Sequence, residues 1–323
     1  MAEAGHRFQL PARAGEPGPR RIGLGLAALG RPGYMNLGHG EDLGGHRTVD
    51  KLRARAHEVL DAAYEAGVRY FDAARSYGRS EEFLGQWLRD RDPDDVVIGS
   101  KWGYVYTAGW EVAADPPEVK RHDVDTFRRQ IAETRRHLGD RLALYQIHSA
   151  TPESSVLADE RVMAELAHLR EDGIAVGITV SGESQPEMIE RAVRLDAFDA
   201  VQATWNLHER TAEEALAHAH DSGLQVIVKE ALANGRLTAR GADPRLSEAA
   251  EEAGTTPDAL ALAAVLARPW ADVVLSGAAT VETLRSNLAA PGLEWTDELE
   301  RRLEALSEES GDYWADRRDL NWN

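Results

Sequence analysis

The sequence has no cysteine among its 323 residues. That absence excludes a disulfide scaffold, thiolate catalysis and zinc sites with cysteine ligands. No apolar run approaches the length of a membrane span. The first residues, MAEAGHRFQLPARAGEPGPRR, also lack the apolar stretch of a secretory signal. We therefore expect a soluble cytoplasmic protein that does not enter a membrane.

Positive charge is also scarce, since 37 lysines and arginines face 55 acidic residues and leave a net charge of −18. This balance argues against nucleic acid or an anionic membrane surface as a partner. Small anions can still bind at local basic groups. His218 and His220 would point to different faces of one helix, and no other set has metal-ligand spacing, so we predict no metal site. The sequence does not indicate an oligomeric state.

Short apolar runs recur along the chain and predict eight strands. They are Ile22–Leu26, Val68–Phe71, Val96–Ile98, Leu142–Ile147, Ile174–Ile178, Ala200–Ala203, Gln225–Val228 and Val273–Leu275. Segments with helical periodicity separate them, such as residues 52–63 and 124–138. Alternating strands and helices predict parallel strands with helical crossovers.

Eight such units in 323 residues predict a (β/α)8 TIM barrel, with a doubly wound open sheet as the alternative. No linker or change of composition divides the chain, so residues 1–323 are predicted to form a single domain. A helix over Asp297–Leu306 and an aromatic tail follow the last strand. That tail could fill a groove or contact another subunit.

Polar residues stand at the predicted carboxyl ends of three neighbouring strands, where barrels carry their active sites. These are Asp72, Lys101 and His148, and Tyr77 lies in the loop after Asp72. A buried carboxylate needs a partner, so we expect Asp72 to pair with Lys101. The nearby ammonium would lower the pKa of Tyr77. The group suits proton transfer at a carbonyl oxygen while hydride moves at carbon.

These residues and their surroundings resemble the aldo-keto reductase family over about residues 20 to 290. The resemblance implies a barrel closed by an N-terminal β-hairpin, here Phe8–Ile22. It also implies hydride transfer between a nicotinamide cofactor and aldehydes, ketones or sugars. Tyr77 would be the general acid, tuned by Asp72 and Lys101, and His148 would orient the carbonyl. The matching segments are Val68–Gly78, Ser100-Lys101, Gln146–His148, Gly177–Ser181, Val201-Gln202 and Gly277–Asn287.

The resemblance also implies a cofactor site on the later strands. Its predicted contacts are Gly25, Thr179, Gln202, Lys229, Leu232, Asn234, Gly277, Glu282 and Asn287. Thr179 and Gln202 would hold the nicotinamide amide, and residues 277–287 would cradle the adenosine end. Residues 23–28 match the fingerprint GxGxxA, but a long loop follows instead of a helix. We interpret these small residues as the turn out of the first strand.

Two departures from the family pattern concern the cofactor. Lys229 or Glu230 stands where an aromatic residue usually stacks on the nicotinamide. The two could pair with each other, or Lys229 could meet a cofactor phosphate. Residues 277–280 lack the basic group expected near a 2′-phosphate, and only Arg285 is close in sequence. We predict NADPH as the cofactor, with NADH possible.

Aromatic residues in the loops predict the substrate pocket wall. The predicted substrate contacts are Tyr34, Trp102 and Trp205, and they suit a sugar-like or hydrophobic carbonyl compound. Two other functions remain open from the sequence. One is a regulatory subunit that senses nicotinamide. The other is a lyase or isomerase that uses Tyr77 and Lys101 without redox chemistry.

Overall fold

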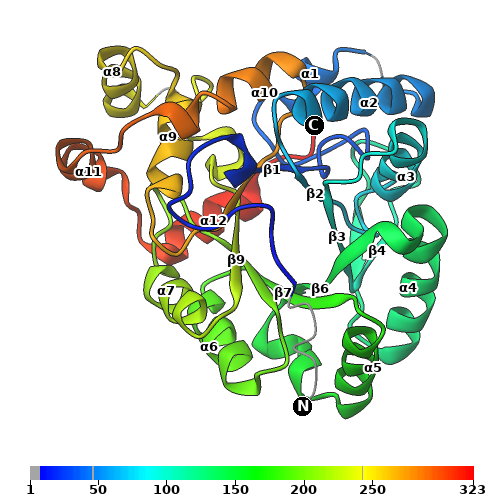
Figure 1. Cartoon of the computed structure of the whole chain (residues 1–323). Helices are drawn as coiled ribbons and strands as arrows, with labels where there is room; N and C mark the ends of the chain where they lie inside the picture. Colours follow the sequence, from blue (N-terminus) through cyan, green and yellow to red (C-terminus); the bar gives the residue numbers. More distant parts are fainter. Residues whose placement is uncertain (1–7, 46, 242) are drawn as a thin grey trace.

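The computed structural model describes residues 8–45, 47–241 and 243–323. Eight parallel strands close into a barrel in the order β1-β10-β9-β8-β7-β6-β3-β2 (Figure 1). The eight predicted strands are confirmed, and the open sheet is excluded because β1 pairs with both β10 and β2. The barrel strands are β1 (Ile22–Gly25), β2 (Tyr70–Asp72), β3 (Val97–Trp102), β6 (Leu142–Ala150), β7 (Ala175–Val180), β8 (Ala200–Thr204), β9 (Gln225–Lys229) and β10 (Val273–Ser276).

Helices surround this barrel (Figure 1). They are α1 (His39–Leu43), α2 (Val49–Glu65), α3 (Ser80–Arg91), α4 (Val124–Leu138), α5 (Glu160–Glu171), α6 (Gln185–Leu195), α7 (Glu213–Asp221), α8 (Pro244–Glu252), α9 (Pro257–Leu266), α10 (Val281–Asn287), α11 (Asp297–Leu303) and α12 (Ser310–Asp319). A two-stranded sheet of β4 (Tyr104–Tyr106) and β5 (Glu118–Lys120) lies in the loop after β3. Within the described ranges, no helix is long and apolar enough to cross a membrane.

Helix α4 shows how local sequence sets these elements. The Asp123 carboxylate caps its first turn by accepting a hydrogen bond from the Thr126 amide at 2.8 Å, which satisfies a free amide of that turn. Val124 and Phe127 are buried on its inner face. Gly139 ends the helix with φ 56°, a conformation that costs glycine little. Apolar residues on one face therefore bring the helix against the barrel.

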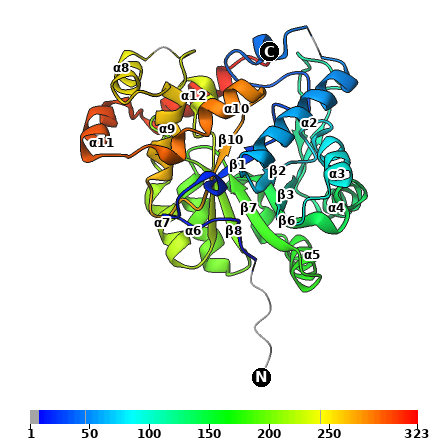
Figure 2. The same cartoon turned by 45° about the horizontal axis from the view of Figure 1, so that its top comes forward.

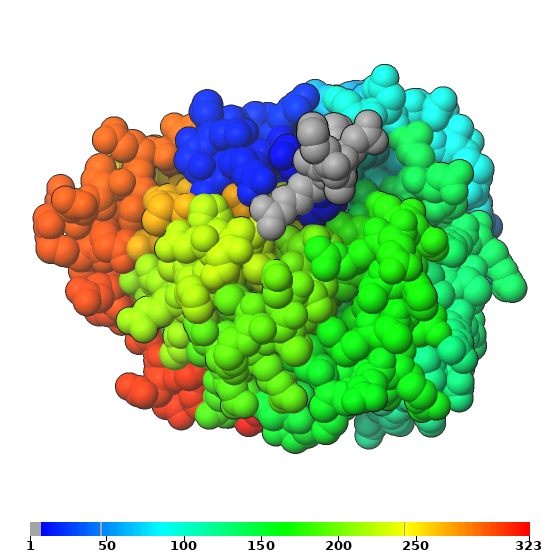
Figure 3. Space-filling model, turned by 60° about the horizontal axis from the view of Figure 1, so that its bottom comes forward, coloured from blue at the N-terminus to red at the C-terminus, as the bar shows by residue number. Residues whose placement is uncertain are grey.

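The segment before β1 is not the predicted hairpin. Phe8 to Gly18 form no strand, and Pro19–Arg21 form a 3₁₀ turn. Three prolines in this segment lack the N–H that a hairpin ladder requires. The segment still covers the barrel bottom, shown in blue in Figure 3. Leu10 packs among side chains from the starts of the strands, and its amide donates to the Gln225 side chain.

The chain end returns to the opposite face of the barrel. The predicted helix over 297–306 is α11 followed by a 3₁₀ turn, and α12 comes after it. The Asn323 backbone exchanges two hydrogen bonds of 3.3 Å with Tyr34, in the loop after β1. Figure 2 shows the C-terminus beside the loop after β1, which is drawn in blue. The long loop predicted after residues 23–28 contains α1, and His46 in this loop lies outside the described residues.

Candidate active site

A buried ion pair lies at the carboxyl ends of β2 and β3. As predicted, Lys101 Nζ contacts Asp72 Oδ2, and both side chains are almost fully buried. The ammonium also donates to the Ala73 carbonyl at 3.1 Å and to Tyr77 Oη at 3.2 Å. Lys101 thus has three oxygen partners, which is what a buried ammonium requires.

Further donors hold the Asp72 carboxylate. Its Oδ1 accepts from Tyr70 Oη at 3.1 Å, from Gln146 Nε2 at 3.2 Å and from Gln202 Nε2 at 3.3 Å. These donors come from three different strands. A fully partnered carboxylate can stay ionised in the barrel interior, so Asp72 fixes the position of the Lys101 ammonium.

Tyr77 and His148 face each other beside this pair. Tyr77 Oη lies 3.5 Å from His148 Nε2, and Ser76 Oγ lies 3.4 Å from Nδ1. Burial, together with the positive charges of Lys101 and Lys229, holds the pKa of His148 well below its usual value. The imidazole is therefore neutral at neutral pH, and it can share a hydrogen bond with a substrate oxygen.

The predicted decrease in the pKa of Tyr77 is wrong. Burial and the Asp72 carboxylate raise the pKa of Tyr77 well above its ordinary value of 10. The sequence argument counted the lysine charge but not the desolvation of the phenolate, nor the carboxylate that neutralises the lysine. Tyr77 is therefore a protonated phenol at neutral pH, which suits a proton donor.

A cavity of about 600 Å³ opens beside these residues, a size typical of sites for small molecules and cofactors. Tyr77, Asp72 and Tyr34 line its wall. All but one of the predicted cofactor contacts line it as well, namely Gly25, Gln202, Lys229, Leu232, Asn234, Gly277, Glu282 and Asn287. The structure thus brings Asp72 and Tyr77, together with all of the predicted cofactor contacts except Thr179, to one cavity. Lys101 and His148 lie behind its wall, in contact with Tyr77.

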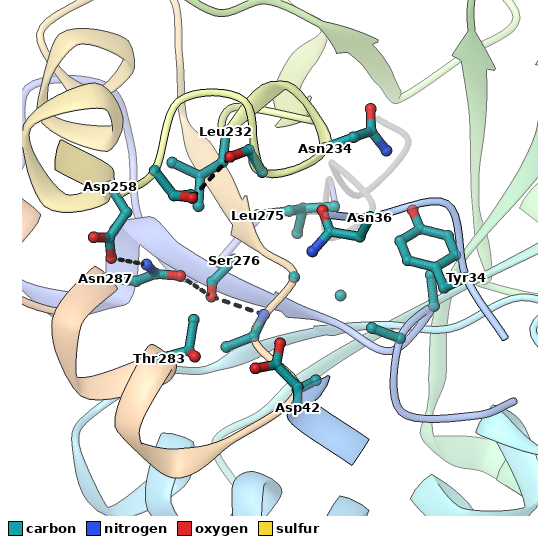
Figure 4. Close-up of a pocket in the computed structure, with 18 of the residues that line it drawn as sticks. Tyr34, Asn36, Asp42, Leu232, Asn234, Asp258, Leu275, Ser276, Thr283 and Asn287 are labelled. Carbon is teal, nitrogen blue, oxygen red and sulfur yellow. Dashed lines mark hydrogen bonds between the residues drawn. The ribbon is translucent and has the colours of Figure 1, made fainter. Parts of the chain in front are cut away.

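Polar side chains lie on both sides of the cavity (Figure 4). On one side, Asn287 accepts from Ser276 Oγ at 2.7 Å and donates to Asp258 Oδ2 at 2.7 Å. Tyr34 lies across the cavity from them. Near Tyr34, the Asn234 amide donates to the Met35 carbonyl at 2.9 Å. Its Oδ1 is buried, with no partner in the described part of the chain.

A buried acceptor without a donor is rare in native proteins. The free Asn234 Oδ1 therefore fits a ligand that brings its own donor. The wall also leaves room for a ligand beside Gly277, because a methyl group added at Gly277 would meet no atom within 4 Å. Amides, hydroxyls and open glycines of this kind fit a polar dinucleotide.

Lys229 is the cation at the end of β9. Its Nζ donates to Ser181 Oγ and Thr204 Oγ1, each at 2.9 Å, and lies 3.8 Å from Glu230 Oε1. Burial lowers the pKa of Lys229 to about 8. Burial would raise the pKa of Glu230, but Arg317 and Lys229 outweigh it and bring that pKa to about 2. Glu230 therefore belongs chiefly to Arg317 of α12, which donates to both carboxylate oxygens.

Three predicted contacts do not reach the cavity. Trp102 is fully buried against Phe127, with ring centroids 5.0 Å apart. Because side chains alternate along a strand, the inward direction of Lys101 sends its neighbour outward to α4. Trp205 is likewise buried and packs on Trp270 at 5.8 Å. Thr179 is buried and accepts from the Ser149 amide at 2.7 Å.

Arg31 is a site residue that the sequence did not reveal. Its guanidinium lies 5.2 Å from the Tyr77 ring centroid, 5.1 Å from that of Tyr34 and 4.5 Å from that of Trp322. It also pairs with Glu118 at 2.9 Å. The aromatic tail thus packs on the mouth of the site, in line with the groove-filling alternative. No local sequence signal links Arg31 to residues so distant along the chain.

Buried neutral histidines make the fold sensitive to acid. Burial lowers the pKa of His39 to about 4, and neither ring nitrogen has a hydrogen-bond partner among the residues that the structure describes. The unfolded chain binds this proton near pH 6.5, so stability is lost as the pH falls from 6.5 towards 4. Between pH 6.5 and pH 4, protonation linked to His39 should lower the free energy of unfolding by on the order of 3 kcal/mol.

Denaturant unfolding of His39→Phe across this pH range checks the expectation. The variant should lose less stability than the parent protein between pH 6.5 and 4. His168→Gln is the matched control, because the His168 side chain is 72% exposed. Equal acid sensitivity in the parent and His39→Phe would contradict the account.

Comparisons with known proteins agree with this geometry. Residues 21–308 match the model of the Aldo/keto reductase family. The chain is 29% identical to D-threo-aldose 1-dehydrogenase of a Pseudomonas species, over 76% of this chain and 77% of that protein. It is 28% identical to pyridoxine 4-dehydrogenase of Escherichia coli, over 88% and 98%. An aldo-keto reductase structure from Bacillus halodurans superposes with a TM-score of 0.69 at 20% identity, over 92% and 97%.

Proposed function

The chain belongs to the aldo/keto reductase family, and from this premise we propose that Tyr77, Lys101, Asp72 and His148 carry its reaction. It is an oxidoreductase that transfers hydride between a nicotinamide cofactor and a carbonyl or alcohol substrate. The observation that carries the assignment of residues is the Lys101 ammonium, which contacts Asp72 and also lies 3.2 Å from Tyr77 Oη. The Tyr77 phenol at the cavity wall therefore lies beside an ammonium that Asp72 holds in place in the barrel.

In this proposal, Tyr77 donates its hydroxyl proton to the carbonyl oxygen as the carbonyl carbon accepts hydride. The bound reduced cofactor supplies that hydride and is oxidised as the substrate is reduced. Lys101 stabilises the phenolate that Tyr77 leaves behind, and Asp72 holds Lys101 in place. Neutral His148, whose Nε2 lies 3.5 Å from Tyr77 Oη, directs the substrate oxygen towards the phenol. Alcohol oxidation reverses these steps and requires Tyr77 as the phenolate, which takes up the alcohol proton.

The cofactor would lie along the cavity that runs past β1, β9 and β10. Gln202 and Lys229 would meet its reacting end, since they line the cavity together with Tyr77. Asn287 and Glu282 would meet the other end. We extend the cofactor proposal to a preference for NADH, although the family resemblance implied NADPH first. Four carboxylates line the wall, namely Glu41, Asp42, Asp258 and Glu282, in addition to Asp72 and Glu230.

The cations near that wall offset only one of these four carboxylates. Both Nη atoms of Arg240, a lining residue, bond to the Asp42 carboxylate. Arg285 is exposed on α10 and does not line the cavity. A 2′-phosphate would bring negative charge to this wall, whereas a 2′-hydroxyl could donate to a carboxylate.

A fluorescence titration with each reduced cofactor tests this proposal. NADH should bind at least roughly ten-fold more tightly than NADPH, a difference of about 1.4 kcal/mol. Glu282→Lys should narrow or reverse that preference, while Glu294→Lys serves as a control because Glu294 does not line the cavity. Tighter NADPH binding would contradict the preference. Binding of neither cofactor would contradict the assignment of the cavity.

The substrate proposed here is a small aldehyde, ketone or sugar-like carbonyl compound. Tyr34 lines the cavity, and the Tyr104 ring lies 4.9 Å from His148, so aromatic surface adjoins the reacting groups. Two relatives are named for an aldose and for pyridoxine, both of which carry alcohol groups. A single domain over residues 1–323 and a cytoplasmic location stay predictions from the sequence.

A further inference from the structure

Lys229 carries a positive charge that its neighbours do not fully compensate. Its two closest oxygen partners are the uncharged hydroxyls of Ser181 and Thr204. Its nearest carboxylate, Glu230 at 3.8 Å, is already paired with Arg317. Two cations and one anion leave this cluster with a net charge of +1. By contrast, the Lys101 ammonium contacts the Asp72 carboxylate directly.

The charge of Lys229 acts at the reacting end of the cavity. Lys229 lines the same cavity as Tyr77 and Gln202. Its Nζ donates to Ser181 Oγ, which lies 3.3 Å from Ser149 Oγ, and Ser149 follows His148 directly in the sequence. The ammonium therefore lies close to the proposed proton-transfer groups. A hydride donor must reach a carbonyl carbon whose oxygen meets Tyr77. The nicotinamide ring of a bound cofactor would therefore lie within the field of Lys229.

We propose that Lys229 makes the site distinguish the two redox states of the cofactor, binding the reduced nicotinamide more tightly than the oxidised one. This inference rests on the proposed function. The oxidised ring carries a positive charge that a buried ammonium repels, whereas the reduced ring is uncharged. Between unit charges a few ångströms apart in a protein interior, such repulsion changes binding by roughly ten-fold or more.

The chemical composition of the site supports a role for this cation beyond packing. Only four of the 37 basic residues of the chain are lysines, and two of them, Lys101 and Lys229, lie at this site. An aromatic side chain at the end of β9 would offer the nicotinamide a stacking surface without charge. Lys229 offers charge instead, so its effect on the ring depends on the oxidation state of the cofactor.

Tighter binding of the reduced form would raise the reduction potential of the bound cofactor. For a two-electron couple, each ten-fold difference in affinity corresponds to about 30 mV. The equilibrium on the enzyme then lies closer to reduced cofactor and carbonyl than it does in solution. Electrons and atoms balance, since in reduction the cofactor ring would give hydride to the carbonyl carbon and Tyr77 its proton to the carbonyl oxygen. Alcohol oxidation reverses both transfers, with the Tyr77 phenolate as the proton acceptor.

Equilibrium binding of four nucleotides tests the inference without turnover. Dissociation constants for NADH and NAD⁺, and in parallel for NADPH and NADP⁺, are measured in the parent protein and in Lys229→Met. The parent should prefer the reduced form, and the variant should lose roughly ten-fold of that preference, mainly by binding the oxidised form more tightly. Lys120→Met is the matched control, because Lys120 does not line the cavity. It should leave the ratio unchanged.

A pH titration of the parent protein gives a second measurement that needs no variant. The groups around Lys229 are Glu230, Arg317, Lys101, Asp72 and His148. Burial keeps Tyr77 protonated and His148 neutral well above pH 7. Because the pKa of Lys229 is about 8, the preference for the reduced form should fall from pH 7 to about pH 9.5.

The outcomes separate the inference from the function on which it rests. If both redox forms bind the parent protein, but Lys229→Met and high pH leave their ratio unchanged, the role of Lys229 is refuted and the cavity assignment stands. If the parent protein binds neither redox form of either cofactor, both the inference and the proposed cofactor site are refuted.

Discussion

Replacing Tyr77 with phenylalanine is expected to lower turnover by roughly 10²- to 10⁴-fold, the contribution typical of a general acid. Burial holds the Tyr77 phenol in its protonated form, and Lys101 lies 3.2 Å from its oxygen. Phenylalanine keeps the ring that packs 5.4 Å from His148 but removes the proton. Single-turnover oxidation of bound NADH by an aldehyde measures the loss directly.

Cofactor affinity separates this effect from a general disturbance of the site. Tyr77→Phe should keep its affinity for NADH within about two-fold, because the hydroxyl faces the carbonyl in our account. Tyr106→Phe is a matched control: Tyr106 Oη is buried without a hydrogen-bond partner and does not line the cavity. Full activity in Tyr77→Phe would refute its assignment as the proton donor.

Lys101→Met should be the most destabilising change at the site. It leaves the Asp72 carboxylate buried without its cation, and an uncompensated buried charge typically costs about 3–5 kcal/mol. Both side chains are almost fully buried, so water cannot take over the role of the ammonium. Turnover should also fall, because the Tyr77 phenolate loses its stabilising charge. Denaturant unfolding at pH 7 measures the first effect.

A second variant separates the loss of charge balance from the loss of packing. Asp72→Asn combined with Lys101→Met removes both charges and should recover part of the lost stability. Lys120→Met, on β5, should change stability little, because its ammonium donates to a backbone carbonyl at 2.9 Å rather than to a buried carboxylate. If Lys101→Met were as stable as the parent protein, the pair would not organise the site.

The sequence predicted the barrel well because the strands are buried on both faces. Apolar runs such as Val273–Leu275, in a strand that is buried throughout, are hard to place anywhere except in a parallel sheet. The Asp72–Lys101 pair followed from the same logic, since neighbouring strand ends meet at one face. The prediction for the residues before β1 was wrong because it followed the family hairpin. Prolines in this segment prevent a regular hydrogen-bonded ladder.

Features that depend on the direction of a side chain, or on contacts between residues far apart in the sequence, could not be predicted. Trp102 follows Lys101 in sequence, and alternation along β3 then sends its side chain into the core. The Arg317–Glu230 pair joins residues 87 positions apart, and no local pattern marks it. The pKa of Tyr77 depends on burial and on Asp72 together, which only the folded arrangement defines.

A crystal structure of the protein with NADH bound would test the central claim most directly. We predict that the nicotinamide lies against Tyr77, Gln202 and Lys229, and that the adenosine end lies beside Asn287 and Glu282. Asn234 Oδ1, which has no partner among the described residues, should then accept a hydrogen bond from the ligand or from a bound water. A cofactor bound outside this cavity, or with its nicotinamide away from Tyr77, would contradict the account.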